Sequence, residues 1–317
     1  MKTSLLKIKA QLDKMAIPYS ISGQADEATE YTFASIKNKI DNGIYYLDTS
    51  IRSYQENIQQ SIIFTTPNTA EQTISSVNAN LIFFVEEPQV IFYQLMQAFI
   101  PQFEPTIHPT AIIHPEAIIH KHCHIGPYAV IGKCEIAENC FIDAHVIIAD
   151  EAFIGKNTKI EGHSYIGATG VAWTFDKAGN KINQPQIGSV HIAENCFIGS
   201  SVSIVRGSVN ESTAIGAGTT IAHGTKIGHG TIIGENCHFA NNVSTAGNSC
   251  IGDNSFLGSG AVVSSHVKVE RFTVIGAGAV VTESFTEESI ILTGVPASKK
   301  GKLEKGQKLN GVPYLGN

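Results

Sequence analysis

Two histidines in successive six-residue segments are the first candidates for chemistry. His223 lies in the run Ile-Ala-His-Gly-Thr-Lys-Ile-Gly, and His229 lies in the run Ile-Gly-His-Gly-Thr-Ile-Ile-Gly. A histidine in a glycine-flanked turn is accessible and can change its protonation state near neutral pH. General base catalysis needs a side chain that accepts a proton from the reacting group, and histidine is the commonest choice. Each side chain is therefore a candidate general base, and the plainer interpretation is a surface histidine.

The other histidines raise the question of a metal site, because all 12 lie between positions 108 and 266. A catalytic zinc needs three converging protein ligands. His223 and His229 are predicted on different sides of one coil, and no third histidine is well placed. His108, His114 and His120 are expected to be exposed turn residues. We therefore expect no metal site, and the six cysteines add no zinc-like spacing.

A period of six residues positions these side chains. The apolar residues that recur at this step fall into three series, Ile107 to Ile131, Ile136 to Ile166, and Ile192 to Val281 with a short insertion. The period fits neither an α-helix nor a single strand. It fits a coil with three flat sides, in which residues 18 positions apart stack and large apolar residues point inward. The sequence therefore predicts a parallel β-helix of hexapeptide repeats over residues 107–285.

The repeat also assigns the cysteines and the interruptions. The inward position reserved for small residues is occupied by Cys123, Cys140, Cys196 and Cys237, which predicts core packing. An extrahelical loop over 168–186 contains the single tryptophan, Trp173, and we expect this side chain to contact substrate. The alternative is a plain connecting loop. A shorter excursion spans Arg206–Ser212. After the repeat ends, residues 286–317 are expected to form a Lys-rich, loosely ordered tail.

Residues 1–106 lack the repeat and alternate between strand and helix patterns, which predicts a small α/β domain that binds nucleotide or sugar. The expected elements are a helix over Ser4–Met15, strands around Gly43–Leu47, Ser61–Thr65 and Asn80–Val85, and a helix from Pro88 to about Ile100. The junction is expected within Pro101–Pro105. The first residues lack the apolar core of an export signal, so a cytoplasmic protein with reduced thiols is expected.

Composition agrees with a mainly β chain. There are 42 Ile but 11 Leu, with 29 Gly and 16% charged residues. Branching at Cβ favours extended backbone, so this balance indicates strands. The net charge of −6 gives no basic surface for nucleic acid. No apolar run is long enough to predict a membrane span.

The repeat resembles the hexapeptide-repeat acyltransferases, which implies a left-handed β-helix and a homotrimer. Within that group the segments Gly167–Gly170, Pro185–Gly188, Arg206-Gly207 and Val262–His266 resemble the UDP-3-O-acylglucosamine N-acyltransferases of lipid A synthesis. The resemblance implies that His229 is the catalytic base and that His266 is a second histidine near the reacting centre. It also implies that Tyr46 and Tyr54 hold the nucleotide base, since an aromatic ring can stack on a base.

The chain departs from that family where the donor should bind. Val205 replaces an aspartate, Ala222-His223 replaces an Asp-Asn pair, Gly230 replaces an asparagine, and the C-terminal helices that meet acyl carrier protein are not expected. The ends Val274–Thr282 and Gly294–Ala297 instead resemble members that use acetyl-CoA. On that resemblance the donor-binding candidates are Gly258, Gly276 and Gly278 for the pantetheine arm and Lys299 (or Lys300) for the CoA phosphates.

These observations predict an N-acyltransferase that moves an acyl group from a thioester, acyl-CoA being favoured, to the amino group of a nucleotide-linked amino sugar for cell-surface glycan or lipid synthesis. The donor is a co-substrate, and no permanently bound cofactor is expected. One alternative is the lipid A enzyme itself, which uses acyl carrier protein. Alternatives of other classes are a zinc lyase of the γ-carbonic-anhydrase type and a non-catalytic β-helix module.

Overall fold

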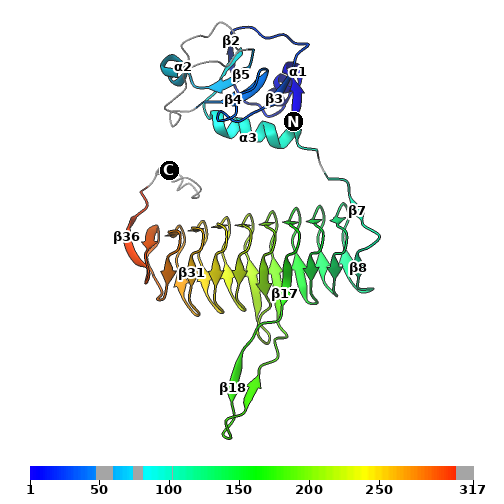
Figure 1. Ribbon diagram of the computed structural model, residues 1–317, viewed down its shortest axis with the longest axis vertical. Helices are drawn as coiled ribbons and strands as arrows, with labels where there is room; N and C mark the ends of the chain where they lie inside the picture. The colour runs from blue at the N-terminus through cyan, green and yellow to red at the C-terminus, as the bar shows by residue number, and fades with distance from the viewer. Residues whose placement is uncertain (48–59, 74–80, 102, 305–317) are drawn as a thin grey trace. The chain divides into compact units, whose positions relative to one another are not determined.

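The computed structural model describes residues 1–47, 60–73, 81–101 and 103–304. The chain divides into two compact units, Met1–Gln102 and Phe103–Asn317 (Figure 1). Each unit has its own buried apolar cluster. The two units are therefore described separately. No helix in these described ranges is both long and apolar enough to cross a membrane.

The first unit is a mixed sheet with helices packed on it. Its described strands are β1 (Lys2–Ser4), β2 (Ser20–Ser22), β3 (Glu30–Phe33), β4 (Gly43–Tyr46), β5 (Ile62–Thr65) and β6 (Leu81–Phe84), in the order β1-β3-β4-β5-β6-β2. Strands β3 to β6 are parallel, and β1 and β2 are antiparallel edges. The helices are α1 (Leu5–Lys14), α2 (Pro67–Thr73) and α3 (Pro88–Phe99). The predicted α/β character of this region is confirmed.

Helices α1 and α3 begin where the sequence predicts, whereas α2 was not predicted. The Ser4 hydroxyl accepts a hydrogen bond from the Lys7 amide at 3.4 Å and caps α1, which buries Leu5, Ile8 and Leu12. Pro88 stands at the first turn of α3, where a missing N–H costs nothing. Strands β1, β2 and β3 were not predicted, because they are short and rich in polar residues.

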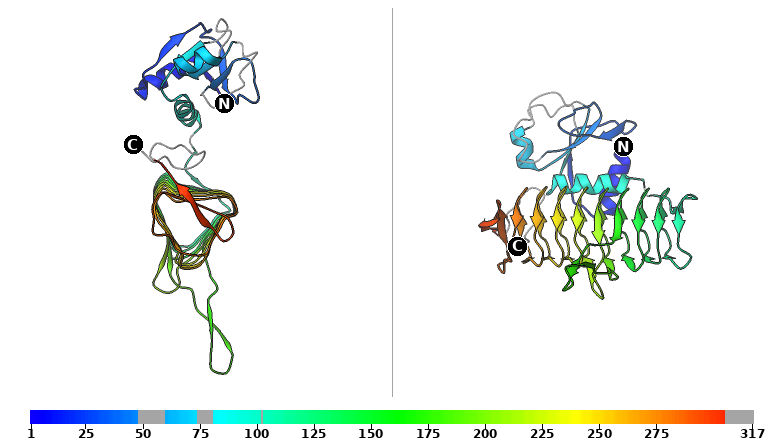
Figure 2. Two further views of the ribbon diagram at one scale, coloured as in Figure 1. Left: turned by 90° about the vertical axis from the view of Figure 1, so that its left-hand side faces the viewer. Right: turned by 60° about the horizontal axis from the view of Figure 1, so that its bottom comes forward.

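The second unit is a β-helix with three parallel faces, and viewed along its axis the coil is triangular (Figure 2). Face 1 contains β7 (Thr106–Ile107), β10 (His124–Ile125), β13 (Phe141–Ile142), β16 (Lys159–Ile160), β21 (Phe197–Ile198), β24 (Thr220–Ile221), β27 (His238–Phe239), β30 (Phe256–Leu257), β33 (Val274–Ile275), β35 (Ile290–Thr293) and β36 (Ser298–Lys302). Face 2 contains β8 (Ile112–Ile113), β11 (Val130–Ile131), β14 (Ile147–Ile148), β17 (Tyr165–Ala168), β22 (Ser203–Val205), β25 (Lys226–Ile227), β28 (Ser244–Thr245), β31 (Val262–Val263) and β34 (Val280–Val281). Face 3 contains β9 (Ile118–Ile119), β12 (Glu135–Ile136), β15 (Ala152–Ile154), β20 (Ser189–Ile192), β23 (Ser212–Ile215), β26 (Ile232–Ile233), β29 (Cys250–Ile251) and β32 (Lys268–Val269).

The predicted stacking of equivalent residues is confirmed by the strand register. Ile215 pairs with Ile233, and Ile233 pairs with Ile251, so the leading apolar residues stack from coil to coil. They are almost entirely buried, as are Cys140, Cys196 and Cys237 in the small inward column. We name the edges of the coil by the faces they join: corner 1–2, corner 2–3 and corner 3–1.

The interruption of the repeat is an antiparallel hairpin that projects from the β-helix (Figure 1). It consists of β18 (Trp173–Phe175) and β19 (Lys181–Asn183), whose residues are all exposed. It leaves the coil after β17 on face 2 and returns at β20 on face 3, so it emerges at corner 2–3. The shorter excursion, residues 206–211 between β22 and β23, emerges at the same corner.

The expectation of a loosely ordered tail is wrong for residues 286–304. Strand β35 pairs in parallel with β33, and β36 returns antiparallel to β35, so both extend face 1. The physical reason is apolar burial, because Ile290 and Leu292 are fully buried and continue the inward column of the coil. The β-helix unit therefore continues past the expected boundary at residue 285. Residues 305–317 lie outside the described part of the chain.

Candidate functional site on corner 2–3

His229 lies at corner 2–3, in the turn that follows β25. The side chain is half-buried, and its Nδ1 lies 3.1 Å from the Ser208 hydroxyl oxygen. The ring covers Gly247, one coil further on: a Cβ at position 247 would stand 2.7 Å from the His229 Cε1. A side chain at 247 would therefore displace the imidazole. The glycine gives the imidazole its place against the next coil.

Gly247 contributes a backbone donor beside this ring. In the part of the chain that the structure describes, its carbonyl accepts the His266 amide at 3.1 Å, whereas its own N–H donates to no backbone carbonyl. His266 is exposed and has a left-handed backbone with φ of 62°. Adjacent coils lie about 4.8 Å apart. The structure thus brings together His229, the Gly247 amide and the His266 turn on three consecutive coils of one corner.

His223 lies elsewhere, at corner 1–2. Its Nδ1 accepts a hydrogen bond from the Ser200 backbone N–H at 2.9 Å, and the Ser200 hydroxyl is 3.0 Å away. A backbone N–H can only donate, so Nδ1 is unprotonated and the neutral ring carries its proton on Nε2. In this arrangement neither nitrogen has a free lone pair for an incoming proton. The structure therefore separates the two sequence candidates in place and in hydrogen bonding.

The 206–211 excursion is fastened to the base of the hairpin by backbone hydrogen bonds. The Ile187 amide donates to the Ser208 carbonyl at 2.8 Å, and the Gly207 amide donates to the Ser189 carbonyl at 3.0 Å. A Cβ on Gly188 would stand 2.6 Å from the Gly207 carbonyl carbon, so this close approach requires glycine. Arg206 adds two bonds, from Nε to the Gly167 carbonyl at 3.2 Å and from Nη2 to the Asp150 carbonyl at 2.7 Å. The segments that resemble the acyltransferase family, Gly167–Gly170, Pro185–Gly188 and Arg206-Gly207, thus lie together beside His229 at this corner.

A buried hydroxyl connects the excursion to the His229 turn. The Thr213 hydroxyl donates to the Val205 carbonyl at 2.6 Å and accepts from the Gly230 amide at 2.9 Å. Thr213 is fully buried in β23. One side chain therefore fixes both the start of the excursion and the residue after His229. Sequence reasoning missed Thr213 and Ser208, because neither stands at a position that the repeat marks as special.

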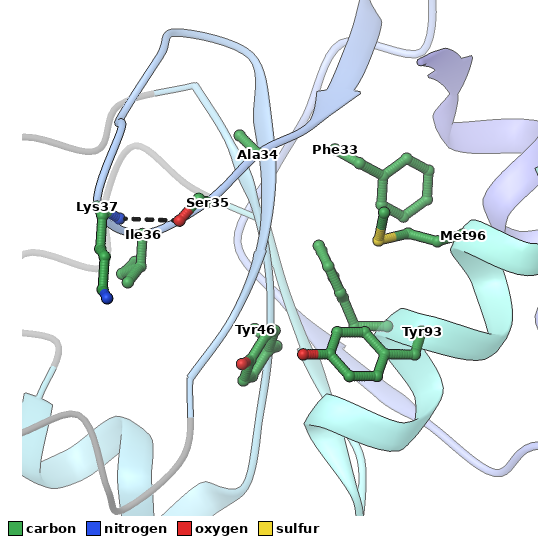
Figure 3. A pocket seen from close by; sticks show the side chains of 9 residues that line it. Phe33, Ala34, Ser35, Ile36, Lys37, Tyr46, Tyr93 and Met96 are labelled. Carbon is green, nitrogen blue, oxygen red and sulfur yellow. Dashed lines mark hydrogen bonds between the residues drawn. The ribbon is translucent and has the colours of Figure 1, made fainter. Parts of the chain in front are cut away.

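The first unit holds an aromatic cavity of about 360 Å³. Its lining includes Tyr46, Phe33, Tyr93, Met96 and Lys37, and Figure 3 shows the rings of Phe33 and Tyr93 beside Met96 and facing the cavity. The cavity lies past the carboxyl ends of parallel strands β3 and β4, the usual edge for ligands in such sheets. Tyr46 and Tyr93 meet edge to face, with ring centres 5.9 Å apart. Tyr46 thus lines a cavity, whereas Tyr54 lies outside the described residues.

The cavity aromatics beyond Tyr46 were not singled out from the sequence. Phe92, Tyr93 and Met96 come from α3, so they reach the cavity only because the helix packs on β3 and β4. The signal available in the sequence was Pro88, which predicts the start of this helix.

The donor-binding candidates lie apart from corner 2–3. Gly258, Gly276 and Gly278 are in turns at corner 1–2, where a Cβ on Gly258 would stand 2.5 Å from the Ala277 amide nitrogen and Gly278 has φ of +67°. Stacking and turn geometry account for these two glycines. Lys299 lies in β36, and its ammonium is 2.6 Å from the Glu287 carboxylate, which lowers the pKa of Glu287 together with Lys302.

Two further expectations concern Trp173 and metal ions. Trp173 is half exposed on the hairpin, and the Lys181 ammonium lies 4.3 Å from the centre of its ring. It is not among the residues that contact His229. Within the described ranges, no group of three His, Cys, Asp or Glu side chains is arranged to hold a metal ion.

The repeat region matches two family models. Residues 212–247 match the bacterial transferase hexapeptide model of six repeats, and residues 250–283 match the hexapeptide repeat of succinyl-transferase. Among curated proteins, the chain is 25% identical over 172 residues to a UDP-3-O-acylglucosamine N-acyltransferase of Coxiella burnetii, covering 42% of this chain. It spans 45% of the length of that relative.

Solved structures extend the likeness to the fold. The UDP-N-acetylglucosamine O-acyltransferase of Moraxella catarrhalis superposes with a TM-score of 0.58 at 25% identity, over 63% of this chain and 76% of that chain. The UDP-N-acetylglucosamine acyltransferase of Arabidopsis gives 0.53 at 28% identity, over 62% and 74%. The β-helix matches the left-handed β-helices of acyltransferases. The chain therefore resembles the hexapeptide-repeat acyltransferases in both its repeat sequence and its fold, and among them the UDP-3-O-acylglucosamine N-acyltransferase family.

Proposed function

We propose that this chain is an N-acyltransferase that moves an acyl group from a thioester to the amino group of a nucleotide-linked amino sugar. The observation that carries the proposal is the placement of the His229 imidazole over Gly247, beside a backbone N–H without a backbone acceptor in the described residues. A base and an oxyanion donor at one point are the two requirements of acyl transfer to an amine. The acyltransferase names of the similar proteins support the same reaction class.

The proposed reaction uses His229 Nε2 as general base. It accepts a proton from the sugar amine while the amine nitrogen attacks the thioester carbonyl carbon. The carbonyl oxygen becomes negative and accepts a hydrogen bond from the Gly247 N–H. When the intermediate collapses, the C–S bond breaks, and the leaving thiolate takes the proton from the imidazolium. The amide product and the free thiol then leave with all charges balanced.

His266, His223 and Trp173 are assigned secondary roles in this proposal. His266 follows Gly247 by one coil on the same corner, so it is proposed to contact the sugar or its phosphates. His223 is a weaker candidate for the base, because the Ser200 amide occupies its Nδ1. Trp173, on the hairpin that leaves this corner, is proposed to contact substrate outside the catalytic step.

The aromatic cavity is proposed to hold the nucleotide base. Tyr46 and Tyr93 supply flat apolar surfaces for stacking, and Lys37 supplies a positive charge for a phosphate. Tyr93→Ala tests the assignment, since the ring is 48% exposed and its loss removes little core packing. We expect KM for the nucleotide sugar to rise about tenfold, as one stacking contact is worth roughly 1–3 kcal/mol. An unchanged KM would move the nucleotide site elsewhere.

Acyl-CoA is the favoured donor, with Gly258, Gly276, Gly278 and Lys299 as the proposed contacts. Acyl carrier protein is the alternative donor, and with it the chain would perform the reaction named for the Coxiella relatives. The test supplies purified protein with UDP- or dTDP-amino sugars and either acyl-CoA or acyl carrier protein thioesters of several chain lengths. Free thiol is measured in each reaction. Turnover with one donor class assigns it, and no turnover with any donor rejects the enzyme.

We further propose that the chain acts as a cytoplasmic homotrimer. The outward side chains of Ile112, Ile118 and Ile232 on faces 2 and 3 are more than half exposed, and packing against other copies would cover them. Light scattering on the purified protein is expected to give three times the 34.0 kDa chain mass. A monomeric mass would reject this part of the proposal.

A further inference from the structure

We propose that Ser208 is the positioning residue of His229: its hydroxyl oxygen accepts the Nδ1 proton and thereby leaves Nε2 unprotonated and ready to act as a base. This inference rests on the proposed function. The contact that suggests it is the 3.1 Å separation between the Ser208 Oγ and the His229 Nδ1. A hydroxyl can donate or accept, and the proposal assigns Ser208 as the acceptor. A neutral imidazole has one N–H and one lone pair, so a proton on Nδ1 leaves the lone pair on Nε2.

Ser208 is a fixed partner, because its backbone cannot move away from His229 without breaking other bonds. Its carbonyl accepts the Ile187 amide, and the preceding Gly207 is bonded to both Gly188 and Ser189. The Thr213 hydroxyl bonds at once to Val205, just before the excursion, and to Gly230, just after His229. The buried Thr213 hydroxyl therefore holds both the segment that leads to Ser208 and the turn that contains His229.

Burial makes the serine hard to replace by water. Ser208 is 8% exposed, although it belongs to an excursion at the surface of the β-helix. The imidazolium formed during the reaction carries an N–H on both nitrogens, so at Nδ1 it can only donate. In the described part of the chain, Ser208 Oγ lies within hydrogen-bond distance of Nδ1 and can accept this proton. Without the Ser208 hydroxyl, the charged Nδ1–H would lack this acceptor in a largely buried place. Hydrogen bonds to charged groups are among the stronger ones, so the loss should be large.

The family resemblance did not select Ser208. The family aspartate that precedes Arg-Gly is Val205 here, and the Val205 side chain is apolar and packs near Gly170. A carboxylate is therefore absent from the place where the resemblance would put it. Ser208 is thus a feature of this chain and is not carried over from the resemblance.

The test compares Ser208→Ala, Ser208→Thr and the control Ser200→Ala. Ser200 is matched, because its hydroxyl stands 3.0 Å from the Nδ1 of His223. We expect Ser208→Ala to lower kcat about tenfold with KM unchanged, the size of one lost hydrogen bond to a charged group. Ser208→Thr retains the hydroxyl and should recover most of kcat, and Ser200→Ala should leave kcat within twofold. An unchanged kcat in Ser208→Ala would overturn the proposal.

A second measurement does not depend on activity. Nitrogen-15 NMR of histidine-labelled protein reports which ring nitrogen carries the proton, and His229→Asn assigns the signal. We expect His229 to be protonated on Nδ1 in the wild type and His223 on Nε2. Wild-type His229 protonated on Nε2 would overturn the inference even if Ser208→Ala failed to fold. Wild-type protein without turnover, but with the expected tautomers, would instead reject the proposed function alone.

Discussion

Corners 1–2 and 2–3 of the β-helix each hold a serine and a histidine in contact, and the two pairs differ in which group of the serine contacts the histidine. At corner 1–2 the coils are regular, and the Ser200 backbone N–H itself reaches the His223 Nδ1. At corner 2–3 the 206–211 excursion interrupts the stacking, and only the Ser208 side chain reaches His229. At corner 1–2 this contact holds Nδ1 unprotonated, whereas at corner 2–3 the acceptor role proposed for Ser208 would leave Nε2 free to act as a base.

The largest expected effect is the difference between the two histidines. His229→Ala should lower kcat/KM by about 10²- to 10⁴-fold, the range for loss of a general base. His223→Ala should remain within about threefold, because its ring has no free lone pair in the described arrangement. Thiol release measured over a range of sugar concentrations separates the two variants. Equal losses in both would remove the distinction between the corners.

Each histidine also packs against a glycine of the neighbouring coil, His229 against Gly247 and His223 against Gly199. Substitution of these two glycines gives the second-largest expected effect. Gly247→Ala should displace the His229 ring, since a Cβ there would stand 2.7 Å from Cε1, and we expect kcat to fall about 10²-fold. Gly199→Ala places a Cβ 2.8 Å from the His223 backbone nitrogen, so it should lower the melting temperature instead. Paired thermal melts and kinetics test this. A melting loss at 247 with normal kcat per folded molecule would contradict it.

The third effect concerns stability at the irregular corner. Thr213→Val removes a buried hydroxyl that serves both the Val205 carbonyl and the Gly230 amide, and we expect a loss of about 1–3 kcal/mol in the free energy of unfolding. Thr225→Val is the matched change near the regular corner, where one longer bond of 3.3 Å to the Ala240 carbonyl is lost. Urea unfolding should therefore show the smaller loss for Thr225→Val. The reverse order would contradict the role given to Thr213.

The smallest expected effect concerns the pH dependence of stability at corner 3–1. Its inward column contains buried thiols and none of the proposed catalytic residues, so it serves as a control for the other two corners. Burial raises the pKa of Cys196 to about 11 and the pKa of Cys237 to about 12. The folded state keeps these thiols neutral after the unfolded chain has begun to ionise near pH 9. The free energy of unfolding should therefore fall as pH rises above about 9, by at most about 1.4 kcal/mol per pH unit for each thiol.

Cys237→Ala should make this alkaline fall shallower when urea unfolding is compared at pH 8 and pH 10.5. The proposed base at corner 2–3 is not involved, so the shape of the kinetic pH profile should be retained in the variant. A steeper fall in Cys237→Ala than in the wild type would mean that the thiol ionises readily in the folded state.

The sequence predicted the β-helix well, because the residues that must be buried are apolar and recur every six positions. Ile221, Ile227 and Ile233 recur at six-residue steps, and each is almost fully buried. Prediction failed at the end of the coil, where Ile290 and Leu292 continue the core after the six-residue step is lost. When the spacing of apolar residues departs from six, the sequence pattern no longer predicts a strand such as β35, although this strand still pairs with β33 and is buried.

The candidate site was predictable in part. The repeat and the resemblance together selected His229 and His266, which the fold brings to one corner. Ser208, Thr213 and the oxyanion candidate Gly247 were not selected, because their roles depend on which coil the excursion leaves and on what lies one coil away. The cavity residues Phe33 and Tyr93 were missed for the same reason, since helix and strand meet only in the packed sheet.

The sequence alone determined the hexapeptide coil, its inward columns of isoleucine and small residues, and the α/β character of the first unit, because periodic burial of apolar side chains leaves a direct trace in residue order. Only the tertiary structure decided which serine group contacts the Nδ1 of each histidine. Each contact joins residues some 20 positions apart, and no residue type by itself records the partner.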